Sequence, residues 1–378
     1  MRIVQLSGSS AGGVGRHVRE VAGLLAAGAR RPGTLPSPTP SDEVLVAGPA
    51  EVLAPLVPQR GLRTAVVEIT DRPRPGDVLA ARRVRRLAHG ADVVHAHGLR
   101  AGALAVLALL GLGDDRPALV VTVHNLPVGG RGVTAVAAAL ETIVARGADV
   151  VLGVSGDLVD RMRARGAHDV ERALVPAPRR LGGTVPSTAT LLSLGLTQGE
   201  RLVLTVGRLA PQKGLDLLCD AAALLARPRD GSDPVSLRWV VVGDGPSGPA
   251  IDARVREERL PVILAGRRED VADLYAAADV VVSTATWEGQ PLAVQEALAA
   301  GAAVVATDVG GTREVTGEAA VLVPPRSARA LADAVRQVLT DDDRRARLQA
   351  AARDRAAELP GPAEVLDQLR AVYERAVR

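Results

Sequence analysis

Short runs of β-branched and aliphatic residues alternate with longer stretches of helical periodicity along almost the whole chain. Strands that are apolar on both faces and alternate with helices are typical of parallel sheets covered by helices on both sides. A length of 378 residues suggests two or three domains. The alternation therefore predicts an α/β protein built from two doubly wound domains in tandem.

Two proline-rich segments interrupt the alternation. Residues 30–41 have no periodicity and predict a surface loop, and residues 176–187 predict the linker between two domains. We expect one domain over residues 1–180, a second over residues 181–360, and a C-terminal helix over residues 361–378 that packs back on the first domain.

The same alternation gives the expected elements. The expected strands are 2–6, 43–47, 64–69, 92–95, 118–123, 149–154 and 171–175, then 201–206, 237–242, 261–265, 279–283, 302–306 and 320–323. The expected helices are 14–28, 77–89, 99–111, 132–146 and 155–165, then 214–226, 247–258, 270–278, 291–300 and 327–338, with a charged helical tail from residue 341. Ligands of doubly wound sheets sit beyond the carboxyl ends of the strands, so residues that follow strands are the candidates for a site.

Composition excludes several classes of protein. Aromatic residues make up 1% of the chain and the formal charge is +3, which argues against a surface that stacks bases or neutralises a duplex. Cys219 is the only cysteine, so neither an intramolecular disulfide nor a zinc site built on cysteine pairs can form. The first residues form a strand rather than a signal peptide, and the longest apolar run is shorter than the ~20 residues that span a bilayer. We therefore expect a cytoplasmic protein that does not bind nucleic acid.

A basic loop follows the first strand of the second domain. Arg208 and Lys213 lie between that strand and the next helix, and Lys213 is the only lysine among 46 basic residues. A guanidinium and an ammonium at this place can neutralise a diphosphate. The alternative is a pair of solvated cations, but the use of the single lysine here favours a binding role.

Glycine-rich segments also follow predicted strands. Residues 8–15 lead into a helix whose N-terminus favours an anion, and residues 242–246 and 308–311 follow later strands. Glycine lets a backbone approach a phosphate or a sugar closely, but each segment also fits a tight structural turn, and both interpretations stay open. The first segment is neither a P-loop nor a clean G-x-G-x-x-G motif.

Two carboxylates flank the start of a predicted helix. Pro291 suits the first helical turn, which places Glu288 in the preceding loop and Glu296 inside the helix. A helical path of eight residues is about 12 Å long, whereas the facing carboxylates of a glycosidase stand about 5–9.5 Å apart. We therefore predict that these two side chains contact different parts of one long ligand.

Three of the six histidines, His95, His97 and His124, lie at the ends of strands in the first domain. With no cysteine and no acidic cluster nearby, the sequence predicts no metal site. A histidine at a strand end can also be a buried core residue. We favour a functional role for His124, and for His97 the two interpretations stay balanced.

Residues 77–89 form a basic amphipathic pattern that contains Arg82, Arg83, Arg85 and Arg86. Such helices can bind anionic lipid. A solvated helix face explains the pattern more simply, so contact with a membrane surface is the minor alternative.

Together these residues resemble the family 4 retaining glycosyltransferases, which have the GT-B fold of two Rossmann-like domains. The resemblance covers nearly the whole chain. It is carried by the segments GGVGRHVREVAGLLAAGA, ADVVHAHG, TVHN, ADVVLGVSGDLVDRM, VGRLAPQKGLDLL, VVGDGP, WEGQPLAVQEALAAG and ATDVGGTREV.

The resemblance implies a nucleotide-diphosphate sugar as co-substrate, with no cofactor and no metal. Arg208 and Lys213 would hold the diphosphate, Glu296 the ribose, and Glu288 with the backbone of residues 289–292 the donor sugar. His124 would stand near the reacting sugar, and His97 near the acceptor. The implied donor-binding residues are Gly12, Gly13, Gly207, Arg208, Lys213, Gly243, Glu288, Gly289, Gln290, Pro291, Leu292 and Glu296, and the implied catalytic residues are His124, Glu288, Arg208 and Lys213.

The implied reaction keeps the configuration of the transferred sugar. Neutralising the departing diphosphate makes the sugar–phosphate bond easier to break, and Arg208 and Lys213 would do so without a metal. In a front-face transfer the leaving phosphate can itself take the acceptor's proton, which would explain why no catalytic base is obvious.

The sequence departs from the family's pattern at four places: Pro176-Ala177-Pro178, Gln290, Gly301-Ala302-Ala303, and the proline-rich insert at residues 30–41 that precedes the second strand. The donor base, the sugar, the linkage, the oligomeric state and the acceptor, whether a small molecule, a lipid-linked sugar or a glycan, stay open. Two other functions fit the same fold, a nucleotide-sugar epimerase and a non-catalytic partner. The presence of Arg208, Lys213, Glu288 and Glu296 favours the transferase.

Overall fold

A computed structural model describes residues 1–8, 13–27, 42–56, 61–70, 73–126, 130–177, 194–197, 199–228 and 233–378. These residues divide into two compact units. Unit 1 comprises Met1–Pro176 and Pro360–Arg378, and unit 2 comprises Ala177–Leu359.

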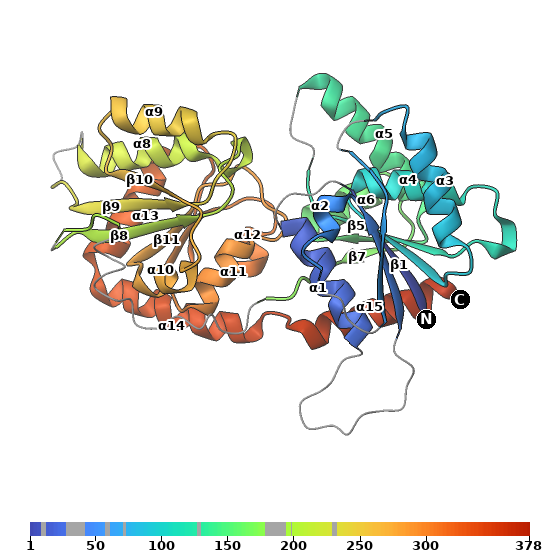
Figure 1. The fold of residues 1–378 in the computed structure, drawn as a ribbon. Coiled ribbons are helices and arrows are strands. Elements are labelled where there is room, and N and C mark those ends of the chain that lie inside the picture. Colours follow the sequence, from blue (N-terminus) through green and yellow to red (C-terminus); the bar gives the residue numbers. More distant parts are fainter. Residues whose placement is uncertain are drawn as a thin grey trace. The chain divides into compact units, whose positions relative to one another are not determined.

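Unit 1 contains a sheet with the strand order β3-β2-β1-β4-β5-β6-β7, in which every pair is parallel (Figure 1). All five residues of β4 and all six of β5 are buried, as expected of central strands covered on both faces. The strands are β1 (Arg2–Ser7), β2 (Glu43–Gly48), β3 (Leu62–Val66), β4 (Val93–His97), β5 (Ala118–Val123), β6 (Val150–Gly153) and β7 (Val170–Arg172).

Helices cover both faces of this sheet. Helices α3, α4 and α5 pack side by side on one face, and α1 packs with α15 on the other (Figure 1). The helices are α1 (Gly13–Ala27), α2 (Ala50–Leu53), α3 (Asp77–Ala88), α4 (Leu99–Leu109), the 3-10 turn Gly113–Asp115, α5 (Arg131–Gly147), α6 (Gly156–Ala164) and α15 (Pro362–Val377).

Helix α15 belongs to unit 1 although the residues of unit 2 precede it in the sequence. The Gln368 side chain accepts a hydrogen bond from Leu174 N at 2.8 Å and donates one to Arg172 O at 2.7 Å. Arg375 pairs with Asp169 at 2.9 Å. Side chains of α15 thus tie it to the segment around β7.

Unit 2 repeats the same topology with the strand order β10-β9-β8-β11-β12-β13, again all parallel. Trp239 on β9 is fully buried, and its indole N–H donates to Thr205 Oγ1 at 3.0 Å. The strands are β8 (Arg201–Val206), β9 (Leu237–Val242), β10 (Val262–Gly266), β11 (Val280–Ser283), β12 (Val304–Thr307) and β13 (Val321–Val323).

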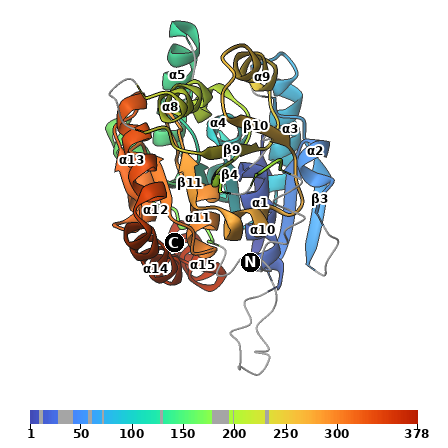
Figure 2. The same cartoon turned by 90° about the vertical axis from the view of Figure 1, so that its left-hand side faces the viewer.

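The helices of unit 2 enclose two apolar cores, one on each face of the sheet. Residues of α8, α9 and α13 form one core and residues of α10, α11 and α14 the other, and Figure 2 shows α8 and α9 on the opposite side of the sheet from α10 and α11. The helices are the 3-10 turn Pro211–Lys213, α8 (Leu215–Ala226), α9 (Gly248–Glu257), α10 (Val271–Ala277), α11 (Leu292–Ala299), α12 (Thr312–Thr316), α13 (Ala328–Thr340) and α14 (Asp342–Glu358).

Two doubly wound parallel sheets confirm the predicted fold class, with local differences. The strand expected at 64–69 is β3, which stops at Val66 because its partner β2 ends at Gly48, opposite Val66. The strand expected at 171–175 is β7, which ends at Arg172, opposite the last residue of β6. Pro291, expected in the first helical turn, is the N-cap residue of α11.

Other expectations fall on residues that the structure does not describe. The expected surface loop at 30–41 lies outside the described residues, as does most of the expected linker at 176–187. Within the described part of the chain, no helix has the length and apolar character needed to cross a membrane.

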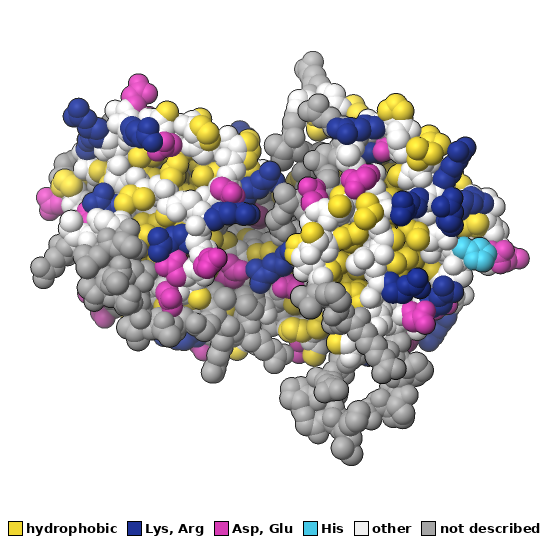
Figure 3. All heavy atoms as spheres, in the orientation of Figure 1, with side chains coloured by type: hydrophobic (Ala, Val, Ile, Leu, Met, Phe, Trp, Pro, Cys, Tyr) yellow, Lys and Arg dark blue, Asp and Glu magenta, His cyan; other side chains and the backbone are white. Residues whose placement is uncertain are grey.

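The basic helix is α3, and Figure 3 shows Lys and Arg side chains gathered over it. Arg82, Arg83, Arg85 and Arg86 are all exposed. Arg85 also donates to the carbonyl oxygens of Ala108 at 3.3 Å and Leu110 at 2.7 Å, at the end of α4. One of the four arginines therefore stabilises the packing of α3 on α4.

Candidate functional site

The basic loop of unit 2 connects β8 to α8. Gly214, the last residue of the loop, has φ 61°, and a Cβ built on it would lie 2.1 Å from Thr284 O. Only glycine allows this left-handed conformation and this approach of the loop to the end of β11. Thr284 Oγ1 donates to Lys213 O at 2.8 Å, and Thr286 N donates to Gln212 O at 2.8 Å. The backbone that carries Lys213 is therefore held in place by the neighbouring strand.

The side chains of Lys213 and Glu288 form an ion pair across this loop. The side chains are 26% and 14% exposed, so the pair is shielded but still reachable from solvent. Arg208 is exposed, and in the described part of the chain its guanidinium has no hydrogen bond or ion pair. This loop thus carries an unpaired cation, Arg208, and a second cation, Lys213, that is paired with a carboxylate.

The glycines of residues 308–311 hold the Glu288 loop. Gly311 N donates to Glu288 O at 2.9 Å, and a Cβ on Gly310, at φ 50°, would lie 2.0 Å from the same oxygen. The Gly311 N–H is therefore used within the protein. Of the two interpretations of this segment, the structure supports the tight turn.

The turn after β9 packs on the basic loop. Gly243 has φ 135°, and a Cβ built on it would lie 1.9 Å from Gly207 O. The Gly243 N–H donates to Gly266 O at 2.8 Å. Gly243 therefore supports the loop that carries Arg208 by letting two backbones come together.

A pocket opens between these loops, at the carboxyl ends of β8 and β11. Of the predicted donor-binding residues, Gly207, Arg208, Lys213, Glu288 and Pro291 line it. Val241, Val281, Val282 and Val294 contribute apolar walls. The pocket therefore combines a charged rim with apolar walls, which is the composition of a small-molecule site.

The remaining predicted residues of this loop and helix are not in the pocket lining. Gln290 Oε1 accepts a hydrogen bond from Gln295 Nε2 at 2.5 Å, and Glu296 Oε2 accepts one from Tyr275 Oη at 3.2 Å. Gly289 is buried and Leu292 begins α11. Gly12 lies outside the described residues, and Gly13 is the first residue of α1.

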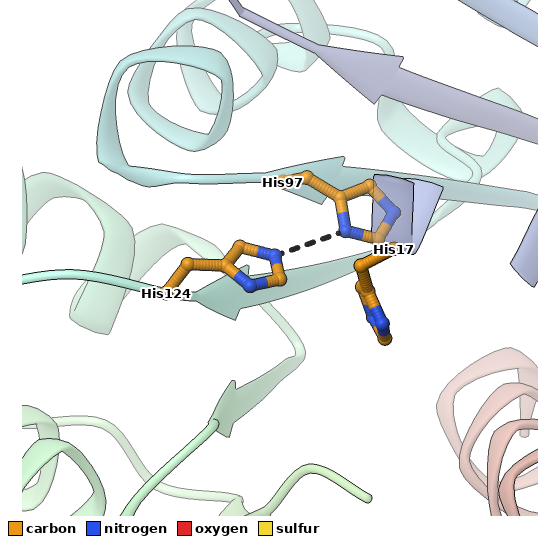
Figure 4. A group of neighbouring side chains, drawn as sticks. All are labelled: His17, His97 and His124. Atoms are coloured by element: carbon orange, nitrogen blue, oxygen red, sulfur yellow. Dashed lines mark hydrogen bonds between the residues drawn. The ribbon is translucent and has the colours of Figure 1, made fainter. Parts of the chain in front are cut away.

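Unit 1 carries a cluster of buried histidines at the carboxyl end of its sheet. His97 ends β4, His124 follows β5, and His17 projects toward them from α1 (Figure 4). Their exposed fractions are 2%, 8% and 6%. His97 Nδ1 lies 3.3 Å from His124 Nε2, and the His17 ring centroid lies 5.2 Å from that of His124. The structure thus brings the two predicted histidines, His97 and His124, into contact.

A buried hydrogen-bond chain continues from this cluster. His97 Nε2 lies 2.6 Å from Gln5 Oε1, and Gln5 Nε2 donates to Tyr373 Oη at 3.0 Å. Tyr373 Oη lies 2.7 Å from His95 Nδ1, and His95 Nε2 lies 2.7 Å from Thr122 Oγ1. An amide oxygen only accepts hydrogen bonds, so His97 carries its proton on Nε2.

Burial lowers the pKa of every histidine in this cluster, because a charged imidazolium loses its hydration there. The pKa falls to about 4 for His17 and to about 3 for His95, where His17 lowers it further. For His97 and His124 burial is again the first cause, and neighbouring histidines add to it. All four rings are therefore neutral near pH 7, and each neutral imidazole keeps one nitrogen lone pair.

Sequence reasoning did not identify three residues of these sites. His17 lies on the apolar stripe of α1 with Val18, Val21 and Leu25, and a histidine on such a stripe is a signal that could have been used. Tyr373 and Tyr275 lie on helices whose packing partners are distant in sequence, and no local pattern indicates their hydrogen bonds.

Two parallel, doubly wound α/β units in one chain form the GT-B fold. The chain belongs to the group 1 glycosyltransferases. Residues 200–341 match the model of that family, and residues 12–178 match the model of the glycosyl transferase 4-like domain.

Among curated relatives, the D-inositol 3-phosphate glycosyltransferase of Corynebacterium urealyticum is 30% identical over 325 residues, which are 79% of this chain and 73% of that protein. The alpha-D-kanosaminyltransferase of Streptomyces kanamyceticus is 30% identical over 46% of this chain and 45% of that protein. The chain thus aligns with most of one relative and with about half of the other.

A solved structure of HepE from Anabaena in complex with UDP has a TM-score of 0.79 and 22% identity, covering 99% of this chain and 100% of that one. Sucrose-phosphate synthase from Thermosynechococcus elongatus has a TM-score of 0.78 and 21% identity, with 99% of both chains covered. At these identities the likeness shows the fold alone.

Proposed function

We propose that this glycosyltransferase moves a sugar from a nucleotide-diphosphate sugar to an acceptor, with retention of configuration and without a metal in the transfer step. The observation that carries the proposal is the pocket of unit 2, where Arg208, Lys213 and Glu288 meet beside an apolar wall. Cations at a strand end suit a diphosphate, and the carboxylate suits the hydroxyl groups of a sugar.

In this proposal the ion pair between Lys213 and Glu288 is exchanged when the donor binds. The diphosphate takes Lys213, and Arg208 contacts the same group with its planar guanidinium. Glu288 is then released to accept hydrogen bonds from the donor sugar. The two cations offset the charge that develops on the leaving diphosphate, which is the main electrostatic requirement of the step.

Glu296 is proposed to bind the donor ribose. Tyr275 Oη donates to Glu296 Oε2 at 3.2 Å, and Tyr275 is 1% exposed, so this hydrogen bond orients the carboxylate. In unit 1, His124 is proposed to act near the reacting sugar and His97 near the acceptor. Both are held by the buried hydrogen-bond chain, and both are neutral.

UDP-sugars are the first donors to test, because the solved structures of Anabaena HepE contain UDP and UDP-glucose. A thermal-shift screen of UDP-, GDP- and ADP-sugars identifies the donor, since ligand at 100 times its Kd adds about 2.7 kcal/mol to the free energy of unfolding. An Arg208→Ala variant should lose most of the shift. A donor that stabilises this variant as strongly as the parent would contradict the proposed site.

The reaction itself is then followed by NMR with the identified donor. Retention predicts that the anomeric configuration of the product matches that of the donor, and a metal-independent step predicts an undiminished rate in EDTA. An inverted product would contradict the proposed stereochemistry. Epimerised sugar formed from UDP-N-acetylglucosamine without an acceptor would contradict the transferase.

A further inference from the structure

Three histidines of unit 1 lie close enough together to hold a metal ion, which the sequence did not indicate. We propose that His17, His97 and His124 bind one divalent transition-metal ion of the kind that prefers imidazole, such as Zn²⁺ or Co²⁺. The inference rests on the geometry of unit 1 alone. Because it uses the same His97 and His124 side chains that the proposed function places near the substrates, a metal ion and the substrates would compete for them.

The first argument is the separation of the ligand atoms. One ring nitrogen from each histidine lies within 4.8 Å of the others. Zinc binds imidazole nitrogen at about 2.0–2.1 Å in tetrahedral geometry, which places two such nitrogens roughly 3.3 Å apart. His97 Nδ1 and His124 Nε2 are 3.3 Å apart. The ligand nitrogen of His17 is at most 4.8 Å from the other two, so it would have to move closer by at most roughly 1.5 Å to reach the same spacing.

The second argument is the protonation of His97. Because Gln5 Oε1 accepts from His97 Nε2–H, the neutral ring keeps its lone pair on Nδ1, which faces His124. A metal-bound histidine ordinarily donates its other N–H to an oxygen in this way, which fixes the ring and raises its basicity. Gln5 is fixed in turn by its hydrogen bond to Tyr373.

The third argument is an unused nitrogen. His17 is buried, and its Nδ1 has no hydrogen-bond partner in the described residues. A buried polar atom without a partner is destabilising, and a metal ion bound through Nδ1 would remove that cost. The His17 ring is steeply inclined to the other two rings, with centroid distances of 5.2 Å to His124 and 5.7 Å to His97.

The ligand set selects the class of metal. Over the described residues the cluster contains three imidazoles and no carboxylate, which suits zinc, cobalt, nickel or copper rather than magnesium or calcium. Three neutral ligands leave the charge of the ion uncompensated. The fourth position is therefore expected to hold hydroxide or another anion that enters from solvent, beside His17 and His124, which keep 6% and 8% exposure.

The test uses the full chain without a histidine tag, stripped of metal by a chelator. Co²⁺ is titrated and followed by its visible absorption, which reports the ligand field. We expect one Co²⁺ per chain, displaced by one Zn²⁺. His17→Ala and His124→Ala should each weaken Co²⁺ binding by at least about tenfold, since even the loss of an outer-shell partner weakens binding by 10–100-fold.

The matched control is the double variant His89→Ala with His168→Ala, which removes the two exposed histidines and should bind as the parent does. Circular dichroism melts check that each variant is folded. X-ray absorption of the zinc-loaded parent needs no variant, and we expect three nitrogen ligands at about 2.0–2.1 Å. Any of three results would overturn the proposal. These are the absence of stoichiometric binding, a loss of binding in the His89→Ala, His168→Ala variant, and a zinc ion with fewer than three nitrogen ligands.

Discussion

Two contacts restrict the Lys213 side chain. Its ammonium contacts the Glu288 carboxylate, and its side chain lies against Gly207, where an added Cβ would be 3.6 Å from Lys213 Cε. This space admits a compact ammonium on a flexible stem. A planar guanidinium needs more room and fixed directions for its five N–H groups.

Lys213→Arg should therefore reduce activity although it conserves the charge. We expect kcat to fall by up to about 10²-fold, or about 2.7 kcal/mol, by analogy with the loss of one preorganised donor. The melting temperature should change little, because a partly exposed cation contributes little to stability. The control is Arg256→Lys on α9, a charge-conserving change at a side chain with 76% exposure. Full activity of Lys213→Arg would show that the single lysine has no special role.

The two carboxylates of the Glu288–Glu296 segment should have separable effects. Glu288→Gln is expected to lower kcat, because the proposed partner of Glu288 is the reacting sugar. Glu296→Ala is expected to raise KM for the donor, because a ribose contact acts equally in the ground and transition states. Steady-state kinetics with the identified donor measure both effects. If both variants kept the parental constants, the assignment of this segment would be wrong.

For single residues, the sequence predicts which side chains belong to a site better than it predicts which side chains contact each other. Arg208 and Lys213 are predicted from one loop and Glu288 from another, and all three line one pocket. The ion pair between Lys213 and Glu288 was not predicted, because it depends on how two loops 75 residues apart approach each other. The same holds for His17, whose role in the cluster depends on the packing of α1 on the sheet.

At the scale of the elements, the turns after β8 and β9 pack directly against each other, so a change in one should displace the other. Gly243→Ala should lower the free energy of unfolding by about 2–4 kcal/mol, because a side chain is strained at φ 135° and its Cβ would overlap Gly207 O at 1.9 Å. Donor binding should weaken as well, since the overlap displaces the loop that carries Arg208. Urea unfolding and the thermal shift with donor measure the two effects.

Gly248→Ala is the matched control for that variant. Gly248 begins α9, and a Cβ there would meet nothing closer than Leu209 Cδ1 at 3.4 Å. Its stability should stay within about 1 kcal/mol of the parent. If Gly243→Ala unfolded at the same urea concentration as Gly248→Ala, the close contact between the two turns would not be important.

Periodicity predicts the long elements and misses the short ones. α13 has Leu331, Val335 and Val338 on one buried face, and such a pattern is visible without a structure. α2 and α12 have four and five residues, too few for a helical period to be recognised. The ends of β3 and β7 follow from the ends of their partner strands, which is information that no single segment contains.

For the molecule as a whole, the single cysteine offers a measure of the stability of unit 2. Cys219 is fully buried in α8, and burial raises the pKa of its thiol from 9.0 to about 11. In the unfolded chain the thiol loses its proton near pH 9, whereas in the folded chain it keeps it. The free energy of unfolding is therefore expected to fall as the pH rises from about 9 toward 11, with a contribution of about 1.4 kcal/mol per pH unit from this group.

A Cys219→Ala variant isolates this contribution, since other groups also titrate in alkali. Urea unfolding of the parent should show a steeper loss of stability above pH 9 than the variant, and the two should run parallel below pH 9. Identical slopes throughout would mean that the thiol titrates alike in both states. Labelling of the parent with a thiol reagent at neutral pH should likewise require unfolding of unit 2.

The two-unit α/β architecture could be predicted from the sequence, because the alternation of elements persists along the chain. The acceptor could not be predicted, because no motif of the sequence specifies it. The histidine cluster lies between these cases. His97 and His124 are visible at strand ends, but their contact and the approach of His17 need the register of β4 with β5 and the packing of α1.

Because α15 belongs to unit 1, the ribosome completes the residues of unit 2 before those of unit 1. Domains ordinarily fold in the order of their synthesis. Here residues 177–359 contain all of unit 2 in one stretch, whereas unit 1 is incomplete until residues 360–378 have been made. Before that, His95 and Gln5 lack Tyr373, and the face of β4 and β5 that α15 covers stays open. A nascent chain should thus complete its second unit first, and its first unit is the part that a chaperone would have to protect.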